Sequence, residues 1–260
     1  MPETSVLKIE NVNKSYKVKK GLNNSSMKRV LENIDLSLYK GEILGLVGES
    51  GCGKTTLGKC ITGLIADYTG NIIYNNQVLS YKTEKERQNN TLQIQMVFQD
   101  PFSSLNPKKK IGWILEEPLH ARRFGTSESR KECVCKTLEL VGLSKDLLTR
   151  YPRELSGGQR QRVSIGTALI LEPSIIIADE PVSALDVSVQ SQILNLFKEL
   201  NQKLGISIIF ISHNLNVVYY LCDRIAVMDK GKIIECETAD KVYYEPKEEY
   251  TRHLLNSILI

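Results

Sequence analysis

Short apolar runs separated by polar segments recur along the chain and predict an α/β fold. Alternating apolar and polar residues predict strands at 7–16 and 30–38. Continuous apolar runs at 42–48 and 206–212 are typical of buried parallel strands. Along 188–204 apolar residues recur every three or four positions, as they do on one face of a helix. The pattern therefore favours a mostly parallel sheet packed against helices.

The remaining segments divide into further core elements and a helical insert. Helical spacing dominates 100–153, where Val134, Leu138 and Val141 follow at intervals of four and three residues. The segment 17–29 is polar, basic and rich in Gly, Asn and Ser, so we expect an exposed loop there. Further strands are predicted at 93–98, 174–178 and 224–229, further helices at 55–64 and 156–171, and a turn at 230–231.

Composition and charge exclude several classes of protein. The 260 residues carry 34 Lys and Arg against 30 Asp and Glu, and a net charge of +4 is too small to indicate nucleic-acid binding. A hydrophobic content of 42% excludes a disordered chain. No apolar stretch approaches the roughly 20 residues of a membrane span, and the amino terminus does not read as a secretory signal. The six cysteines, including the pair Cys133 and Cys135, are expected to be reduced intracellular thiols.

The segment GESGCGKT at 48–55 carries the clearest chemistry. It matches G-x-x-x-x-G-K-[S/T] and lies between a predicted strand and a predicted helix. Its glycines let backbone N–H groups point at phosphate oxygens, and the start of the helix adds partial positive charge. We expect Lys54 to bridge the β- and γ-phosphates of a nucleotide and Thr55 to ligate Mg²⁺. The nucleotide-binding residues predicted here are Gly48, Glu49, Ser50, Gly51, Cys52, Gly53, Lys54, Thr55 and Thr56.

Two acids, Asp179 and Glu180, directly follow the predicted strand 174–178. Parallel sheets bind their ligands at the carboxyl ends of the strands. We therefore expect Asp179 to hold Mg²⁺ and Glu180 to polarise an attacking water. The alternative is a pair of acids that only caps the next helix, and the phosphate loop disfavours it. The loop and the acids together predict a phosphate-loop NTPase.

The pentapeptide LSGGQ at 155–159 narrows this class, because a serine and two glycines at a helix start form a second anion-binding nest. With it, the sequence resembles the ATP-binding-cassette family of transporter ATPases. The resemblance runs from about Leu7 to Glu235. It implies a phosphate-loop NTPase core with a mostly parallel sheet, an antiparallel β subdomain and a helical signature subdomain.

The resemblance assigns roles to four further positions. Tyr16 occupies the adenine-stacking position, and a flat ring there suits a purine. Gln99 follows a strand and can bond water, Mg²⁺ or the helical insert, so Thr55, Gln99 and Asp179 form the implied magnesium set. His213 follows another strand and can donate to a γ-phosphate oxygen. The segment SALD, which ends at Asp186, corresponds to the D-loop.

The family also implies a head-to-tail dimer. Each ATP would lie between the phosphate loop of one subunit and the LSGGQ of the other, so that ATP joins the two and hydrolysis releases them. The residues implied on the signature side of the nucleotide are Ser156, Gly157, Gly158, Gln159 and Asp186.

Three segments look like the dipeptide, oligopeptide and nickel import branch of the family, namely MVFQDPFSSLNP at 96–107, YPRELSGGQRQRV at 151–163 and EPKEEYTRHLLNSI at 245–258. One ATPase of a pair in this branch commonly carries a cysteine-rich iron–sulfur segment in its tail, whereas here only Cys236 lies in the tail. The chain therefore resembles the second, shorter ATPase of a non-identical pair.

This resemblance implies an ATPase that powers peptide import from the cytoplasmic face of the membrane. Its implied partners are a second, non-identical cassette, two membrane permease subunits and, indirectly, an extracytoplasmic solute-binding protein, with no nucleic acid. Import of nickel, cobalt or a metallophore is the alternative, because cargo choice lies in the other subunits. A soluble cassette ATPase without a transport role is a more distant alternative.

A single cassette domain is expected over 1–260, with its catalytic core at 1–98 and 160–235, its helical subdomain at about 100–159 and a tail at 236–260.

Some positions depart from the family pattern. Asn214 stands where Asp usually follows the switch histidine, Gly166 and Thr167 replace Ala-Arg, and Val182 replaces Thr. None is an implied phosphate contact, so they affect helix packing or the D-loop rather than the use of ATP.

Overall fold

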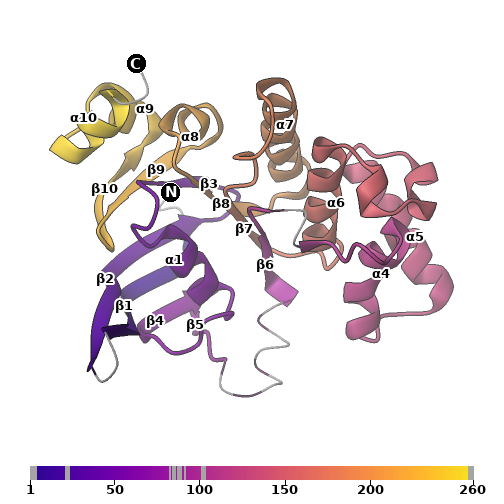
Figure 1. The fold of residues 1–260 in the computed structure, drawn as a ribbon, viewed down its shortest axis with the longest axis horizontal. Helices are drawn as coiled ribbons and strands as arrows, with labels where there is room; N and C mark the ends of the chain where they lie inside the picture. The colour runs from indigo at the N-terminus through magenta and orange to yellow at the C-terminus, as the bar shows by residue number, and fades with distance from the viewer. Residues whose placement is uncertain are drawn as a thin grey trace. The chain divides into compact units, whose positions relative to one another are not determined.

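The computed structural model describes residues 5–20, 24–81, 83, 86, 90, 92–100 and 104–256 (Figure 1). The chain divides into two compact units. Unit 1 comprises 1–91 and 207–260, and unit 2 comprises 92–206.

Unit 1 contains an antiparallel sheet with the strand order β2-β1-β4-β5. Its strands are β1 (Ser5–Lys20), β2 (Asn24–Tyr39), β4 (Thr69–Tyr74) and β5 (Gln77–Val78). Val12 of β1 pairs with Ile34 of β2, and both side chains are fully buried together with Ile72 of β4. The alternating apolar residues that predicted β1 and β2 are thus the buried face of this sheet.

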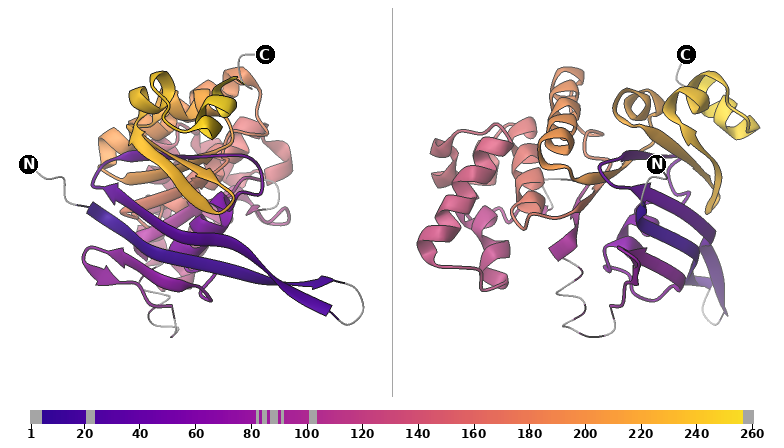
Figure 2. Two further views of the ribbon diagram at one scale, coloured as in Figure 1. Left: turned by 90° about the vertical axis from the view of Figure 1, so that its left-hand side faces the viewer. Right: turned by 180° about the vertical axis from the view of Figure 1, so that it is seen from behind.

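The prediction of a loop at 17–29 is wrong, because β1 and β2 continue as a two-stranded ribbon, whereas the exposure expected there is confirmed at most of the described side chains. Lys17 pairs with Met27 and Val18 with Ser26, and the turn at 21–23 lies outside the described residues. The ribbon extends past the part of β1 that pairs with β4 (Figure 2, left). Among the side chains of the ribbon that the structure describes, Lys17, Val18, Met27 and Lys28 are exposed, so these positions lack the buried face that produces an alternating pattern in the sequence.

A second set of strands in unit 1 has the order β10-β9-β3-β8. Its members are β3 (Ile43–Val47), β8 (Ser207–Ser212), β9 (Arg224–Asp229) and β10 (Lys232–Thr238). Strand β3 pairs in parallel with both β8 and β9, and every residue of β3 and β8 is buried. The predicted turn at 230–231 joins β9 to the antiparallel β10.

The helices of unit 1 include, among the described residues, α1 (Lys54–Ile61), α8 (Leu215–Leu221), α9 (Ala239–Tyr244) and α10 (Glu249–Asn256). Most of the tail expected from 236 onward is therefore ordered, as the end of β10 and two helices. Residues 257–260 of that tail lie outside the described part of the chain.

Unit 2 contains the parallel strands β6 (Ile94–Val97) and β7 (Ile175–Asp179) with four α-helices among its described residues. These helices are α4 (Ile111–Ala121), α5 (Ser127–Leu140), α6 (Gly157–Leu169) and α7 (Val187–Leu204). Short 3-10 helices at Lys145–Thr149 and Pro152–Glu154 precede α6. On α7 the predicted apolar face is buried through Ile193, Phe197 and Leu200.

The insert motif DPFSSLNP lies only partly in the described chain, since Pro101, Phe102 and Ser103 are outside it. The finer division into a core at 1–98 and 160–235, a helical subdomain at about 100–159 and a tail stays a prediction. Among the described helices, none combines the length and apolar character needed to cross a membrane.

Candidate nucleotide-binding site

The predicted phosphate loop connects β3 to α1 within unit 1, as the sequence pattern required. A Cβ on Gly48 would lie 2.1 Å from the carbonyl oxygen of Met228, so the loop enters too close to β9 for any side chain. Gly53 caps α1 with a φ of 119°, a conformation that L residues rarely adopt. These two glycines fix the path of the backbone around the start of α1.

Lys54 places its ammonium group against the loop that precedes it. Its Nζ donates to the carbonyl oxygens of Gly48, at 2.6 Å, and Glu49, at 2.9 Å, and the residue is only 4% exposed. The first turn of α1 carries no acid that would offset this cation. Burial also raises the pKa of the neighbouring Cys52 thiol, so this side chain stays neutral. The donor set fits a polyphosphate at a helix N-terminus.

Tyr16 is partly exposed on β1, at 38%, with the Lys14 ammonium 4.7 Å from its ring centroid. Lys14 is itself 3% exposed, and its Nζ donates to the carbonyl oxygen of Asp67 at 2.8 Å and pairs with the Asp67 carboxylate. The Lys14 ammonium therefore lies over the ring proposed to stack on adenine. The sequence pattern does not single out Lys14, whose only signal is a lysine on a predicted strand two residues before the tyrosine.

The two acids lie at the end of β7 in unit 2. Asp179 is 3% exposed and closes the strand. Glu180 follows in the left-handed region, with φ at 46°, a conformation that costs a non-glycine residue roughly 1–3 kcal/mol. Its carbonyl oxygen accepts from the N–H and the hydroxyl of Ser183. The turn directs the Glu180 side chain so that its Oε2 accepts from the Gln99 amide at 3.3 Å.

The signature LSGGQ starts α6. The Ser156 hydroxyl accepts from the Gln159 N–H at 3.3 Å, and the Gln159 side chain accepts from the Ser156 N–H at 3.0 Å. The serine and glutamine therefore form a reciprocal capping box. A Cβ on Gly158 would approach Val189 of α7 to 2.6 Å, which favours glycine at this place in the signature. The cap takes up the N–H groups of Ser156 and Gln159 and fixes the start of α6.

Asp186 and Asn214 both begin helices. The Asp186 carboxylate accepts from the Val189 N–H at 3.0 Å, and this bond lowers the pKa of the carboxyl. The Asn214 side chain accepts from the N–H groups of Asn216 and Val217 at the start of α8. Asn and Asp cap helices about equally well. The departure at Asn214 therefore leaves the start of this helix intact.

The structure brings the predicted residues together in two groups. In unit 1, Val47 pairs with Ser212, so Gly48 and His213 leave the same edge of neighbouring parallel strands. In unit 2, Val97 pairs with Ala178, which carries Gln99 and Glu180 to one edge. His213 is exposed at its strand end. Both groups stand where parallel sheets bind ligands.

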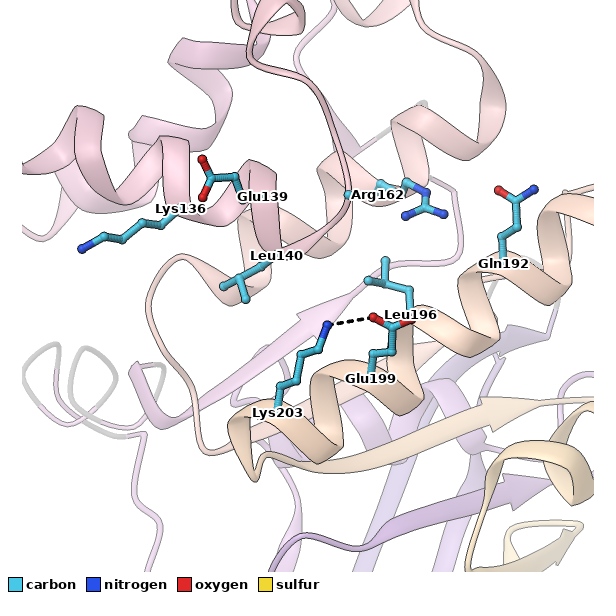
Figure 3. A pocket seen from close by; sticks show the side chains of 9 residues that line it. Lys136, Glu139, Leu140, Arg162, Gln192, Leu196, Glu199 and Lys203 are labelled. Atoms are coloured by element: carbon cyan, nitrogen blue, oxygen red, sulfur yellow. Dashed lines mark hydrogen bonds and ion pairs between the residues drawn. The ribbon is translucent and has the colours of Figure 1, made fainter.

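A hollow of about 600 Å³ in unit 2 is separate from these groups (Figure 3). It is lined by residues of α5, α6 and α7, where Lys203 pairs with Glu199 at 3.0 Å. Arg162 on its wall donates to the Val141 carbonyl at 2.8 Å. None of the predicted nucleotide-binding residues lines it, so this hollow is not the predicted nucleotide site.

A phosphate loop before α1, an acid pair at the end of β7 and a capped LSGGQ helix define the class of cassette ATPases. The family model described as ABC transporter matches residues 31–183. The chain belongs to the ABC transporter family, which confirms the resemblance, the ATPase class and the binding of ATP.

Individual relatives match over most of the chain. The oligopeptide transport ATP-binding protein AppF of Bacillus subtilis is 43% identical over 259 residues, 98% of this chain and 79% of AppF. The cbiO1 structure from Clostridium perfringens, part of the ABC transporter complex cbiONQ, has a TM-score of 0.82 at 28% identity and covers 94% of this chain and 92% of its own.

A third match is a dimer of the ATP-binding cassette MJ0796 in a post-hydrolysis state, bound to ADP and phosphate. It has a TM-score of 0.79 at 30% identity over 90% of this chain and 98% of its own. These structures confirm the predicted fold class, with its mostly parallel phosphate-loop sheet, antiparallel β subdomain and helices. The roles of individual site residues stay predictions.

Proposed function

We propose that this chain is the ATP-hydrolysing subunit of a peptide importer. The observation that carries the ATP role is the enclosure of the Lys54 ammonium by the carbonyls of Gly48 and Glu49 at the start of α1. This places a buried cation at the N-terminus of α1, a combination suited to the phosphates of ATP. The peptide cargo is supported by the 43% identity to AppF, whose name describes oligopeptide transport.

In this proposal the loop 48–55 and Thr56 hold the phosphates, and Tyr16 stacks on the adenine ring. Thr55, Asp179 and Gln99 would hold Mg²⁺, which supplies charge neutralisation for phosphoryl transfer. Glu180 orients and deprotonates the attacking water. Its left-handed backbone and its bond from Gln99 fix the carboxylate for that task.

The exposed imidazole of His213 stands at the edge that Gly48 also leaves, which supports a hydrogen bond from His213 to a γ-phosphate oxygen. The capping box of α6 supports the second half of the site. The helix start formed by Ser156, Gly157 and Gly158 would bind the γ-phosphate of ATP held by a partner cassette. Gln159 completes the cap of this helix, and Asp186 caps α7 at the end of the D-loop.

The proposed assembly follows from an ATP site whose two halves belong to two different cassettes. We propose a second, non-identical cassette, two membrane permeases and an indirect link to an extracytoplasmic solute-binding protein, with the chain on the cytoplasmic face of the membrane. The dimeric state of the similar MJ0796 cassette supports the pairing of two cassettes. Alone, the chain is then expected to be largely monomeric, with low ATPase activity.

The test is purification of the tagged chain from native membranes, followed by uptake in vesicles that contain the co-purified subunits. We expect two permeases, a second cassette and ATP-dependent uptake of labelled oligopeptides. Uptake of nickel without peptide would overturn the cargo. Association with ribosomes instead of permeases would overturn the transport role.

A further inference from the structure

The C-terminal helix α10 contacts the phosphate loop through Tyr250. The backbone N–H of Glu49 donates to the Tyr250 hydroxyl at 3.0 Å, across 201 positions of sequence. Both residues belong to unit 1. Burial raises the pKa of Tyr250, so the group that receives this bond is a neutral hydroxyl.

Both polar groups of the Glu49 backbone form hydrogen bonds. Its N–H bonds to Tyr250, while its carbonyl oxygen accepts from Lys54 Nζ at 2.9 Å. The tail and the lysine of the phosphate loop therefore restrain the same residue.

Glu235 of β10 anchors the start of α10. Its carboxylate accepts from the N–H of Lys247 at 3.0 Å, the N–H of Glu248 at 3.3 Å and the hydroxyl of Thr251 at 2.7 Å. Glu235 is 7% exposed and Thr251 is fully buried. Three bonds to one buried carboxylate fix the start of α10, the helix that carries Tyr250.

We propose that Tyr250 is a positioning residue for ATP binding. Its hydroxyl holds the backbone of Glu49, so that the phosphate loop is ordered before the nucleotide binds. The inference rests on the proposed function, in which loop 48–55 binds the phosphates of ATP. A loop that is already ordered pays less conformational entropy on binding. We call this arrangement, in which Glu235 anchors α10 and Tyr250 of α10 bonds to Glu49, the brace of the phosphate loop.

The removal of one hydroxyl tests this brace in the full-length chain. Tyr250→Phe keeps the ring but leaves the Glu49 N–H without its acceptor. We expect ATP to bind about fivefold more weakly, equivalent to about 1 kcal/mol. The KM for ATP should rise by the same factor with kcat unchanged in the reconstituted complex, because an ordered loop favours substrate and transition state alike.

Tyr243→Phe is the matched control. Its hydroxyl donates to Asn216 at 2.9 Å, away from the loop, so the same loss of one oxygen should leave ATP affinity at the wild-type value. Glu235→Gln is a second variant that loosens the anchor without touching Tyr250. It should speed amide exchange in α10 and weaken ATP binding in the same direction as Tyr250→Phe.

Amide hydrogen exchange without nucleotide measures the brace directly. We expect the Glu49 amide to exchange at least fivefold faster in Tyr250→Phe than in the wild type or in Tyr243→Phe. Unchanged exchange at Glu49, or unchanged ATP affinity in Tyr250→Phe, would overturn the brace. If the wild-type chain itself failed to bind ATP while its Glu49 amide stayed protected, the proposed function would fall, and the brace would lose its role in binding.

Discussion

The side-chain amide of Gln99 donates to the carboxylate of Glu180 at 3.3 Å. The two residues come from strands that pair in parallel, with Val97 opposite Ala178. The contact links Glu180, the proposed catalytic base, to the residue that precedes the helical insert. A change at one of these residues is therefore expected to alter the other.

Glu180→Gln should retain ATP binding and lose hydrolysis. The substitution keeps size and shape but removes the base that activates water, a loss of about 10²- to 10⁴-fold in rate. Phosphate release by the assembled complex is the measurement, with ATP affinity as its control. Wild-type turnover in this variant would refute the role of Glu180.

Gln99→Ala should lower transport more than ATP binding. It removes the donor to Glu180 but none of the residues in loop 48–55. Peptide uptake per ATP hydrolysed, compared in vesicles, measures the coupling. If uptake and ATP affinity fall by equal factors, Gln99 acts in binding and not in coupling.

Lys14→Met should weaken ATP binding through Tyr16. The variant keeps a long apolar side chain but removes the ammonium that lies 4.7 Å from the Tyr16 ring centroid. We expect a loss of about three- to tenfold in affinity, smaller than the loss for Tyr16→Ala, since base–aromatic stacking is worth about 1–3 kcal/mol. Lys17→Met, at an exposed position of the same strand, is the control and should bind normally.

Asn214 should tolerate aspartate but not alanine. Asn214→Asp keeps the oxygen that caps α8 and should unfold at the wild-type denaturant concentration. Asn214→Ala removes it and should cost about 1 kcal/mol in the free energy of unfolding. Equal stability of all three proteins in urea would show that the cap contributes nothing.

The sequence predicts those strands and helices in which apolar residues recur at a regular spacing and line a buried face. Strands β3 and β8, helix α7 and the loop 48–55 fall within a residue or two of their predicted bounds. The ribbon at 17–29 was missed because none of its described side chains is buried, so these positions leave no alternating pattern in the sequence.

Residues of the candidate site could be predicted from the sequence only where they stand together in one short motif. Lys54, Glu180 and Ser156 stand in motifs that can be read along the chain. The contact of Tyr250 with Glu49 joins positions 201 residues apart, and no local pattern reports such a pair. The cation above Tyr16 likewise depends on Asp67, which a different part of the chain supplies.

The most direct test of the central claim is the affinity of Lys54→Ala for magnesium-ATP, measured by calorimetry on the full chain. Lys54 Nζ supplies the buried cation of the loop, so we expect ATP binding to fall below detection and hydrolysis in the complex to stop. The fold should persist, with a loss of about 1–2 kcal/mol from the two bonds to loop carbonyls. Wild-type affinity and turnover in a folded Lys54→Ala protein would contradict the assignment of loop 48–55 as the ATP site.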